Sequence, residues 1–106
     1  DAENRMYAGP CSLDFLSMAG HIEDLASNST MVSCNMRKII DNLYYMAAIE
    51  LMHAAQAVDL REIPQLGEGT KPLFEAYRKK VPYLDNDRNM SVDIQKTYEF
   101  LKSYKA

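Results

Sequence analysis

The longest uninterrupted segment of this sequence constrains its fold the most. Residues 21–63 contain neither Gly nor Pro, and apolar side chains recur along most of that segment at steps of three to five. Such spacing is typical of an α-helix. It predicts one long helix over about residues 23–60, whose recurring apolar positions are Met31, Cys34, Ile39, Leu43, Met46, Ile49, Ala54, Ala57 and Leu60.

This helix is too long and too apolar to be covered by the rest of the chain. About 36 helical residues reach on the order of 50 Å, which exceeds the width of a globule of this length. Its middle, Leu43–Val58, is apolar on nearly all sides, so it must be covered from several directions. We therefore expect other chains, or another part of the same protein, to bury the helix, and we expect a homo-oligomer that assembles through it.

The remaining sequence predicts an irregular arm and two short helices. Residues 1–20 show poor periodicity and form the arm, whereas residues 21–106 form a helical segment. Thr70 and Ser91 are candidate N-caps for helices over about residues 71–80 and 92–103. The expected fold class is all-α, with one long helix and two shorter ones forming part of a multi-chain helical bundle.

Composition excludes several classes of partner. The net charge is −3, and the longest run of basic residues is Arg78-Lys79-Lys80, which argues against nucleic acid. The most apolar stretch, residues 42–58, contains Glu50 and is shorter than the roughly 20 residues needed to cross a bilayer, so we expect no membrane span.

The cysteine content and the first residues bear on the cellular location of the protein and on whether the sequence is a piece of a longer one. Cys11 and Cys34 are too few for a disulfide scaffold, and no secretory signal is visible, so we expect reduced thiols and a cytoplasmic location. Because the sequence begins at Asp rather than Met, we expect a piece of a longer protein.

The densest polar cluster, residues 21–24, lies where the long helix is expected to begin. A carboxylate at a helix start is stabilised by the helix dipole, so residue types alone favour Glu23 or Asp24 as a cap. The functional alternative makes Glu23 an acid, a base or an ammonium-binding group. A metal site that combines His21 and Glu23 with Asp24 or His53 is a third alternative, and we expect no metal.

Other candidates along the long helix are interpreted as structural. Glu50 and His53 share one helix face, and a hydrogen bond between helices is favoured over a catalytic pair. Adjacent Tyr44 and Tyr45 are not expected to face one partner. Packing against neighbours is the interpretation of Met31, Met36, Met46 and Met52.

The order of several short segments resembles the C-terminal part of the aromatic amino acid lyases, a family that includes histidine, phenylalanine and tyrosine ammonia-lyases and related aminomutases. The spacing matches the family pattern without a gap from Pro10 to Arg61. Further short matches near the C-terminus are similar to bacterial histidine ammonia-lyases. The matching segments are Pro10-Cys11-Ser12-Leu13-Asp14, Glu23-Asp24, Ala48-Ile49-Glu50-Leu51, residues 54–61, Val81-Pro82, Asp87-Arg88 and Asp93-Ile94.

This resemblance implies an all-helical homotetramer that eliminates ammonia from histidine, tyrosine or phenylalanine. It also implies a methylidene-imidazolone group made from an internal Ala-Ser-Gly, which this sequence lacks; Ala26-Ser27-Asn28 is only a look-alike without the glycine. The prosthetic group is therefore expected outside this segment, which should be inactive alone. By position, Glu23 matches the carboxylate of the substrate pocket, with Ile22 beside it, and Asp14 and Asp24 are expected to be structural supports.

Two positions differ from the family pattern, so the sequence does not identify the substrate. Ile22 stands where the family has Gln, and Leu25 stands where histidine lyases have His. Phenylalanine lyases carry an apolar residue at the Leu25 position but Gln in place of Glu23. An aromatic amino acid 2,3-aminomutase and a non-catalytic helical interaction module remain as alternatives to an ammonia-lyase most similar to the histidine enzymes.

Overall fold

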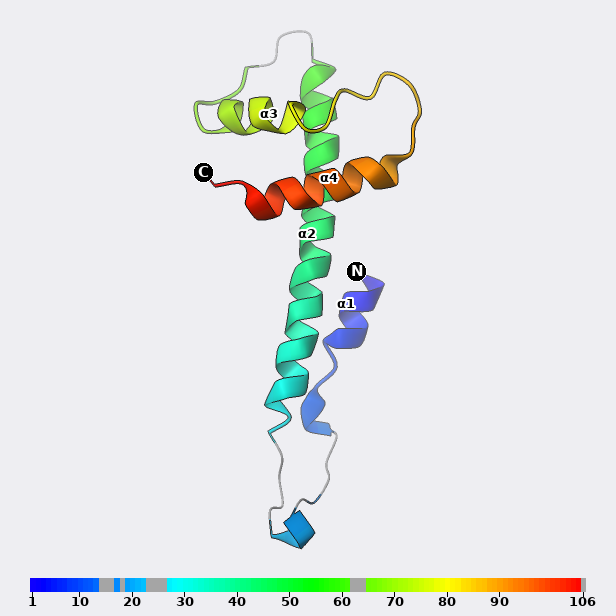
Figure 1. Ribbon diagram of the computed structural model, residues 1–106, viewed down its shortest axis with the longest axis vertical. Coiled ribbons are helices and arrows are strands. Elements are labelled where there is room, and N and C mark those ends of the chain that lie inside the picture. Colours follow the sequence, from blue (N-terminus) through cyan, green and yellow to red (C-terminus); the bar gives the residue numbers. More distant parts are fainter. Residues whose placement is uncertain (14–16, 18, 23–26, 62–64, 106) are drawn as a thin grey trace. The chain divides into compact units, whose positions relative to one another are not determined.

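The computed structural model describes residues 1–13, 17, 19–22, 27–61 and 65–105, and their regular structure is entirely helical (Figure 1). These residues divide into two compact units, Asp1–Asn42 and Leu43–Ala106, and the helix α2 contributes to both. The elements in chain order are α1 (Ala2–Tyr7), two short 3-10 helices η1 (Cys11–Leu13) and η2 (Ala19–His21), α2 (Ser29–Asp59), α3 (Thr70–Arg78) and α4 (Met90–Ser103).

The long helix is a single element of 31 residues, but it begins later than expected. The sequence predicts a start near residue 23, whereas α2 begins at Ser29. The residue before it, Asn28, has φ 48, a left-handed backbone conformation that a helix does not contain. The expectation of an irregular arm over residues 1–20 also needs correction, because α1 occupies Ala2–Tyr7.

The two short helices begin differently from the prediction. Helix α4 is capped by Asn89, whose side chain accepts a hydrogen bond from the Ser91 backbone N–H, so Ser91 is not the cap. Helix α3 has Gly69 at its cap position without a side-chain bond. The Thr70 hydroxyl instead donates to the Gly67 carbonyl, because Thr70 already belongs to the first helical turn.

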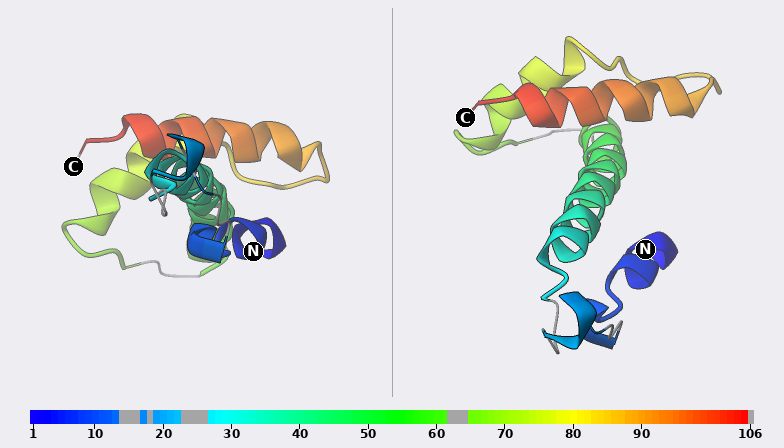
Figure 2. Two further views of the ribbon diagram at one scale, coloured as in Figure 1. Left: turned by 90° about the horizontal axis from the view of Figure 1, so that it is seen from below. Right: turned by 60° about the horizontal axis from the view of Figure 1, so that its bottom comes forward.

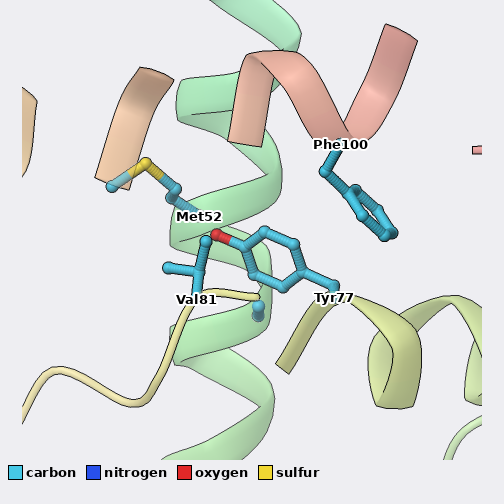
Figure 3. Packing of buried hydrophobic residues seen from close by; sticks show 5 residues of the cluster. Met52, Tyr77, Val81 and Phe100 are labelled. Carbon is cyan, nitrogen blue, oxygen red and sulfur yellow. The ribbon is translucent and has the colours of Figure 1, made fainter. Parts of the chain in front are cut away.

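The core of the second unit lies where α3 and α4 pack on the C-terminal part of α2 (Figure 2). From α2 it takes Ala48, Met52 and Ala55, which recur at helical spacing and include two small side chains that permit close approach. Figure 3 shows Met52, Val81 and Phe100 around the ring of Tyr77. The Tyr77 and Phe100 rings meet edge to face, with centroids 5.6 Å apart.

A second contact between α2 and α4 is aromatic and corrects an expectation. Tyr44 and Tyr45 both contact the ring of Tyr98, with centroid distances of 6.2 and 4.2 Å. The sequence argument fails here because a large ring on a crossing helix reaches two adjacent positions. The Lys102 ammonium lies 4.6 Å from the centre of the Tyr98 ring and extends the cluster.

The loop between α3 and α4 is held by side chains. Gln56 of α2 donates to the Leu84 carbonyl (2.9 Å) and accepts from the Leu84 N–H (3.2 Å). Arg88 pairs with the buried carboxylate of Asp93 at 2.7 Å and also donates to two loop carbonyls. These bonds give the loop a fixed path although it contains no regular structure.

The buried phenol of Tyr77 completes a polar chain inside this core. Thr97 donates its hydroxyl proton to the Asp93 carbonyl, so the Tyr77 hydroxyl must donate to Thr97 at 3.1 Å. Burial is the largest cause that raises the pKa of Tyr77 above its ordinary value of 10.0, although the nearby Arg78 charge opposes it.

Because the folded protein holds the phenol proton more tightly than the unfolded chain, Tyr77 should make stability depend on alkaline pH. Its contribution is fully present below about pH 10 and is lost as the pH rises toward the raised pKa. We expect the melting temperature of the protein to fall less between about pH 9 and pH 11 in Tyr77→Phe than in the parent. Equal falls in both proteins would contradict this.

Candidate functional site

The candidate site residues lie in the first unit, and the structure describes only part of them. Ile22 lies in a turn, and its side chain is 84% exposed. Glu23, Asp24 and Leu25 lie outside the described residues, as does Asp14. The expected roles of these residues therefore stay predictions. The structure describes the residues that come before and after them in the chain.

The backbone just before Ile22 turns through a left-handed conformation. Ala19 has φ 52 and Gly20 has φ 67, and both belong to η2. An added Cβ at Gly20 would meet nothing within 4 Å, so the backbone angle, not lack of space, is what favours glycine there. Ile22 follows this turn directly and is exposed in the described chain.

The other flank is fastened to the arm by two asparagines. Asn28 donates from its side-chain amide to the Cys11 carbonyl at 2.9 Å, and Asn35 donates to the Cys11 sulfur at 3.7 Å. The Asn28 carbonyl also accepts the bond from the Val32 N–H that opens α2. The bond to Cys11 thus joins two residues that are 17 positions apart in the chain.

A third asparagine fastens α1 to the same helix. The Asn42 amide donates to Glu3 at 3.1 Å and to Asn4 at 2.9 Å. The Lys38 ammonium lies 4.7 Å from the centre of the Tyr7 ring. We call the set Asn28, Asn35, Lys38 and Asn42 the arm-binding face of α2.

Sequence reasoning missed the arm-binding face, although one signal was present. Asn28, Asn35 and Asn42 are spaced by seven residues, which is close to two helical turns and places Asn35 and Asn42 on one side of α2, with Asn28 directly before the helix. Amide side chains that recur at this spacing on one side of a helix indicate a polar neighbour. The sequence does not say that this neighbour is the chain's own arm.

The second unit holds the other predicted pair, and the structure does not make it a site. Glu50 and His53 are both exposed, and His53 Nδ1 lies 2.8 Å from the Ile49 carbonyl of its own helix. The expected hydrogen bond between helices is therefore wrong for His53. The ring is satisfied locally because the i−4 carbonyl of a helix lies within its reach.

A small cavity of about 90 Å³ adjoins His53, and its charged groups are already paired. Arg78 forms an ion pair with Asp59 at 2.5 Å, and Arg88 pairs with Asp93. Among the described residues there is no group of three His, Cys, Asp or Glu side chains that could hold a metal. This cavity belongs to the framework that fixes α3 and α4.

Comparison with known proteins tests the family resemblance, which the geometry of the described residues alone does not. The family model for aromatic amino acid lyases matches residues 1–79. The chain belongs to the aromatic amino acid lyase family. The resemblance drawn from the sequence is thereby confirmed, and so is the all-α fold class for the residues described.

Individual lyases of this family match nearly the whole chain. Histidine ammonia-lyase of Halalkalibacterium halodurans is 38% identical over 95% of the chain, and that of Treponema denticola is 33% identical over 96%. The solved ergothionase of Treponema denticola, an ergothioneine-degrading enzyme in complex with desmethyl-ergothioneine sulfonic acid, is 48% identical over 96% of the chain, with a TM-score of 0.90. In each case the chain spans about 20% of the relative's length.

No helix in the described part of this lyase chain is both long and apolar enough to cross a membrane. Several large apolar side chains of α2 are exposed in the described chain. In the first unit these include Met31, Val32, Met36 and Ile40, and in the second they include Leu43, Met46 and Ile49.

Proposed function

We propose that this chain is the C-terminal segment of a lyase that eliminates the amine from a histidine-derived substrate, and that this substrate is ergothioneine. The observation that carries the substrate is a comparison within one organism. The chain is 48% identical to the ergothionase of Treponema denticola and 33% identical to the histidine ammonia-lyase of the same bacterium. The departures at Ile22 and Leu25 from the Gln and His of histidine lyases argue against histidine as the preferred substrate.

Histidine is the second candidate substrate. Curated histidine ammonia-lyases match this chain at 33–38% identity, so an enzyme that releases ammonia from histidine has support of its own. The two substrates share an imidazole-type ring and a carboxylate, but ergothioneine carries a trimethylammonium group where histidine carries an ammonium. The two candidate substrates thus differ in the amine that the reaction would release.

In this proposal the reaction is an elimination. A proton leaves Cβ of the substrate, its electron pair forms the Cα–Cβ double bond, and the Cα–N bond breaks so that the amine departs with its electrons. Glu23 is the carboxylate that holds the substrate or moves its proton. Its negative charge suits a substrate with a cationic nitrogen, which Gln at this position would attract less.

The methylidene-imidazolone that the resemblance implies would come from a part of the protein beyond this chain. The sequence holds no Ala-Ser-Gly from which it could form, and no described residue is assigned to it. When bound, it would supply an electrophile. The contribution of this chain to the reaction is the Glu23 carboxylate.

The substrate proposal is tested by ultraviolet absorbance assays of the full-length protein, because the unsaturated acids formed from these substrates absorb there. We expect kcat/KM for ergothioneine to exceed that for histidine by about 100-fold or more, the discrimination that a pocket reaches through the size and apolar contacts of a substrate group. Tyrosine and phenylalanine serve as further comparisons. Preferred turnover of histidine would select the second candidate, and turnover of neither would remove the proposal.

We also propose that the full-length protein is a homo-oligomer held together through α2. The side chains of Met36 and Ile40 are 57% and 48% exposed, which leaves apolar surface uncovered in the first unit. Such a face is normally buried against another helix. The methionines predicted to pack against neighbours fit this, since only Met52 among the four is buried within the described chain.

Replacing Ile40 by Asp should break the assembly. A carboxylate placed in an apolar contact between helices loses its hydration without gaining a partner. We expect light scattering coupled to gel filtration to show smaller species for Ile40→Asp, whereas the control Ile40→Leu keeps the parent's mass. An unchanged mass for Ile40→Asp would place the interface elsewhere.

A further inference from the structure

Tyr98 of α4 has two tyrosine neighbours on α2, and the two contacts differ in geometry. The Tyr45 ring is stacked on the Tyr98 ring, with centroids 4.2 Å apart and an angle of 17° between the ring planes. The Tyr44 ring meets Tyr98 edge to face, with centroids 6.2 Å apart and an angle of 76°. All three residues are half-buried, so each keeps some surface that a small dissolved molecule can reach.

Hydrogen bonds hold the stacked pair in place at the phenol oxygens. The Tyr45 hydroxyl donates to Gln95 Oε1 at 3.0 Å, and Gln95 lies one turn before Tyr98 on α4. The Gln95 amide in turn donates to the Glu99 carboxylate at 3.0 Å. The Tyr98 hydroxyl accepts a hydrogen bond from the Lys102 ammonium. Both rings are therefore held face to face by contacts on their own helices and across the helix crossing.

Two phenols in this arrangement have the geometry that oxidative coupling requires. When a phenol loses one electron and one proton, the unpaired electron is shared between its oxygen and the ring carbons ortho and para to it. The orbitals that hold it project from the ring faces, so they overlap in a stacked pair and not in an edge-to-face pair. Reaction within such a held pair is favoured strongly over reaction between separate molecules.

We propose that Tyr45 and Tyr98 are an oxidative modification site, at which a peroxide-driven one-electron oxidant joins the two rings as dityrosine. Each phenol loses one electron and one proton, and the two radicals form a C–C bond between ring carbons ortho to the oxygens. Each of these carbons then releases its hydrogen as a proton, and each oxygen takes one up. Two hydrogen atoms leave the pair in total, and one hydrogen peroxide is reduced to two waters.

The new bond would join α2 to α4 and close a loop that contains α3. A covalent link of this kind restricts the unfolded chain more than the folded one, so it stabilises the packing of these helices. Neither tyrosine takes part in the proposed elimination, so this inference is independent of the substrate and of Glu23.

The test treats the full-length protein with hydrogen peroxide and a haem peroxidase. Digestion and mass spectrometry should find a peptide that joins Tyr98 to Tyr45 and has lost two hydrogen atoms, with fragmentation assigning the partner on α2. Because the coupling occurs within one chain, the yield of this peptide per chain should not change when the protein is diluted.

Two matched variants separate the stacked neighbour from the edge-to-face one. Tyr45→Phe keeps the ring but has no phenol to oxidise, so it should lower the yield of cross-linked peptides that contain Tyr98 by about tenfold or more. Tyr44→Phe is the control, and its yield should stay within about twofold of the parent. Circular dichroism checks that both variants keep the helical content of the parent.

Three results would overturn the inference. The first is a link from Tyr98 to Tyr44, or an equal yield in Tyr45→Phe and the parent, which would mean that stacking does not select the partner. The second is a yield that rises with protein concentration, which would mean that the coupling occurs between molecules. The third is the absence of any peptide that joins α2 to α4.

Discussion

Glu23→Gln in the full-length protein is expected to lower kcat/KM by about 100-fold or more, the usual contribution of a positioned acid, base or charged binding group. Gln keeps the size and the hydrogen-bonding capacity of the side chain but can neither carry the charge nor take up a proton at neutral pH. The absorbance assay with ergothioneine and with histidine measures the loss for both substrates.

The matched control for this variant is Glu50→Gln, because Glu50 is an exposed carboxylate on α2 to which no role in the site is assigned. It should leave kcat/KM unchanged. If Glu23→Gln retains turnover within about threefold of the parent, Glu23 takes no part in the mechanism.

Tyr77→Ala is expected to lower the free energy of unfolding by about 3–5 kcal/mol, the range for truncating a large buried aromatic side chain. The Tyr77 ring is fully buried between Met52, Val81 and Phe100, so its removal leaves a void where α2, α3 and α4 meet. Chemical denaturation of the protein followed by circular dichroism measures the change.

The control Tyr77→Phe separates packing from hydrogen bonding. Phe keeps the ring, and Thr97 still donates to the Asp93 carbonyl, so no buried donor is stranded. The expected cost is about 1 kcal/mol. Equal losses for the Ala and Phe variants would mean that the hydroxyl, not the ring, stabilises this core.

The sequence predicted the long helix well because its signals are local. Residues 21–63 lack helix breakers, and the apolar spacing is helical throughout, so α2 follows from pattern alone. Its start was misplaced because Glu23 and Asp24 are themselves favourable at a helix N-terminus. Asn28, a preferred residue before a helix, lies only a few positions further on and begins it instead.

The elements that the sequence missed depend on contacts distant in the chain. Helix α1 has only six residues, too few to be stable without a neighbour, and its neighbour is Asn42. The attachment of Cys11 to Asn28 likewise joins positions that no periodicity relates. Glu23 could be proposed only through the family resemblance, since residue types alone favoured a helix cap.

The paired hydrogen bonds between Gln56 and the main chain of Leu84 explain why the family motif has Gln at this position. A carboxamide is the side-chain group that offers a donor and an acceptor side by side. It can therefore make to a single residue the same pair of hydrogen bonds that the main chain of a neighbouring β-strand would make. Glutamate would repel the carbonyl, and methionine would leave both main-chain groups without a partner. The Gln within Ala54-Ala55-Gln56-Ala57 thus has an architectural reason: it lets an irregular connection lie against a helix without the cost of bare peptide groups.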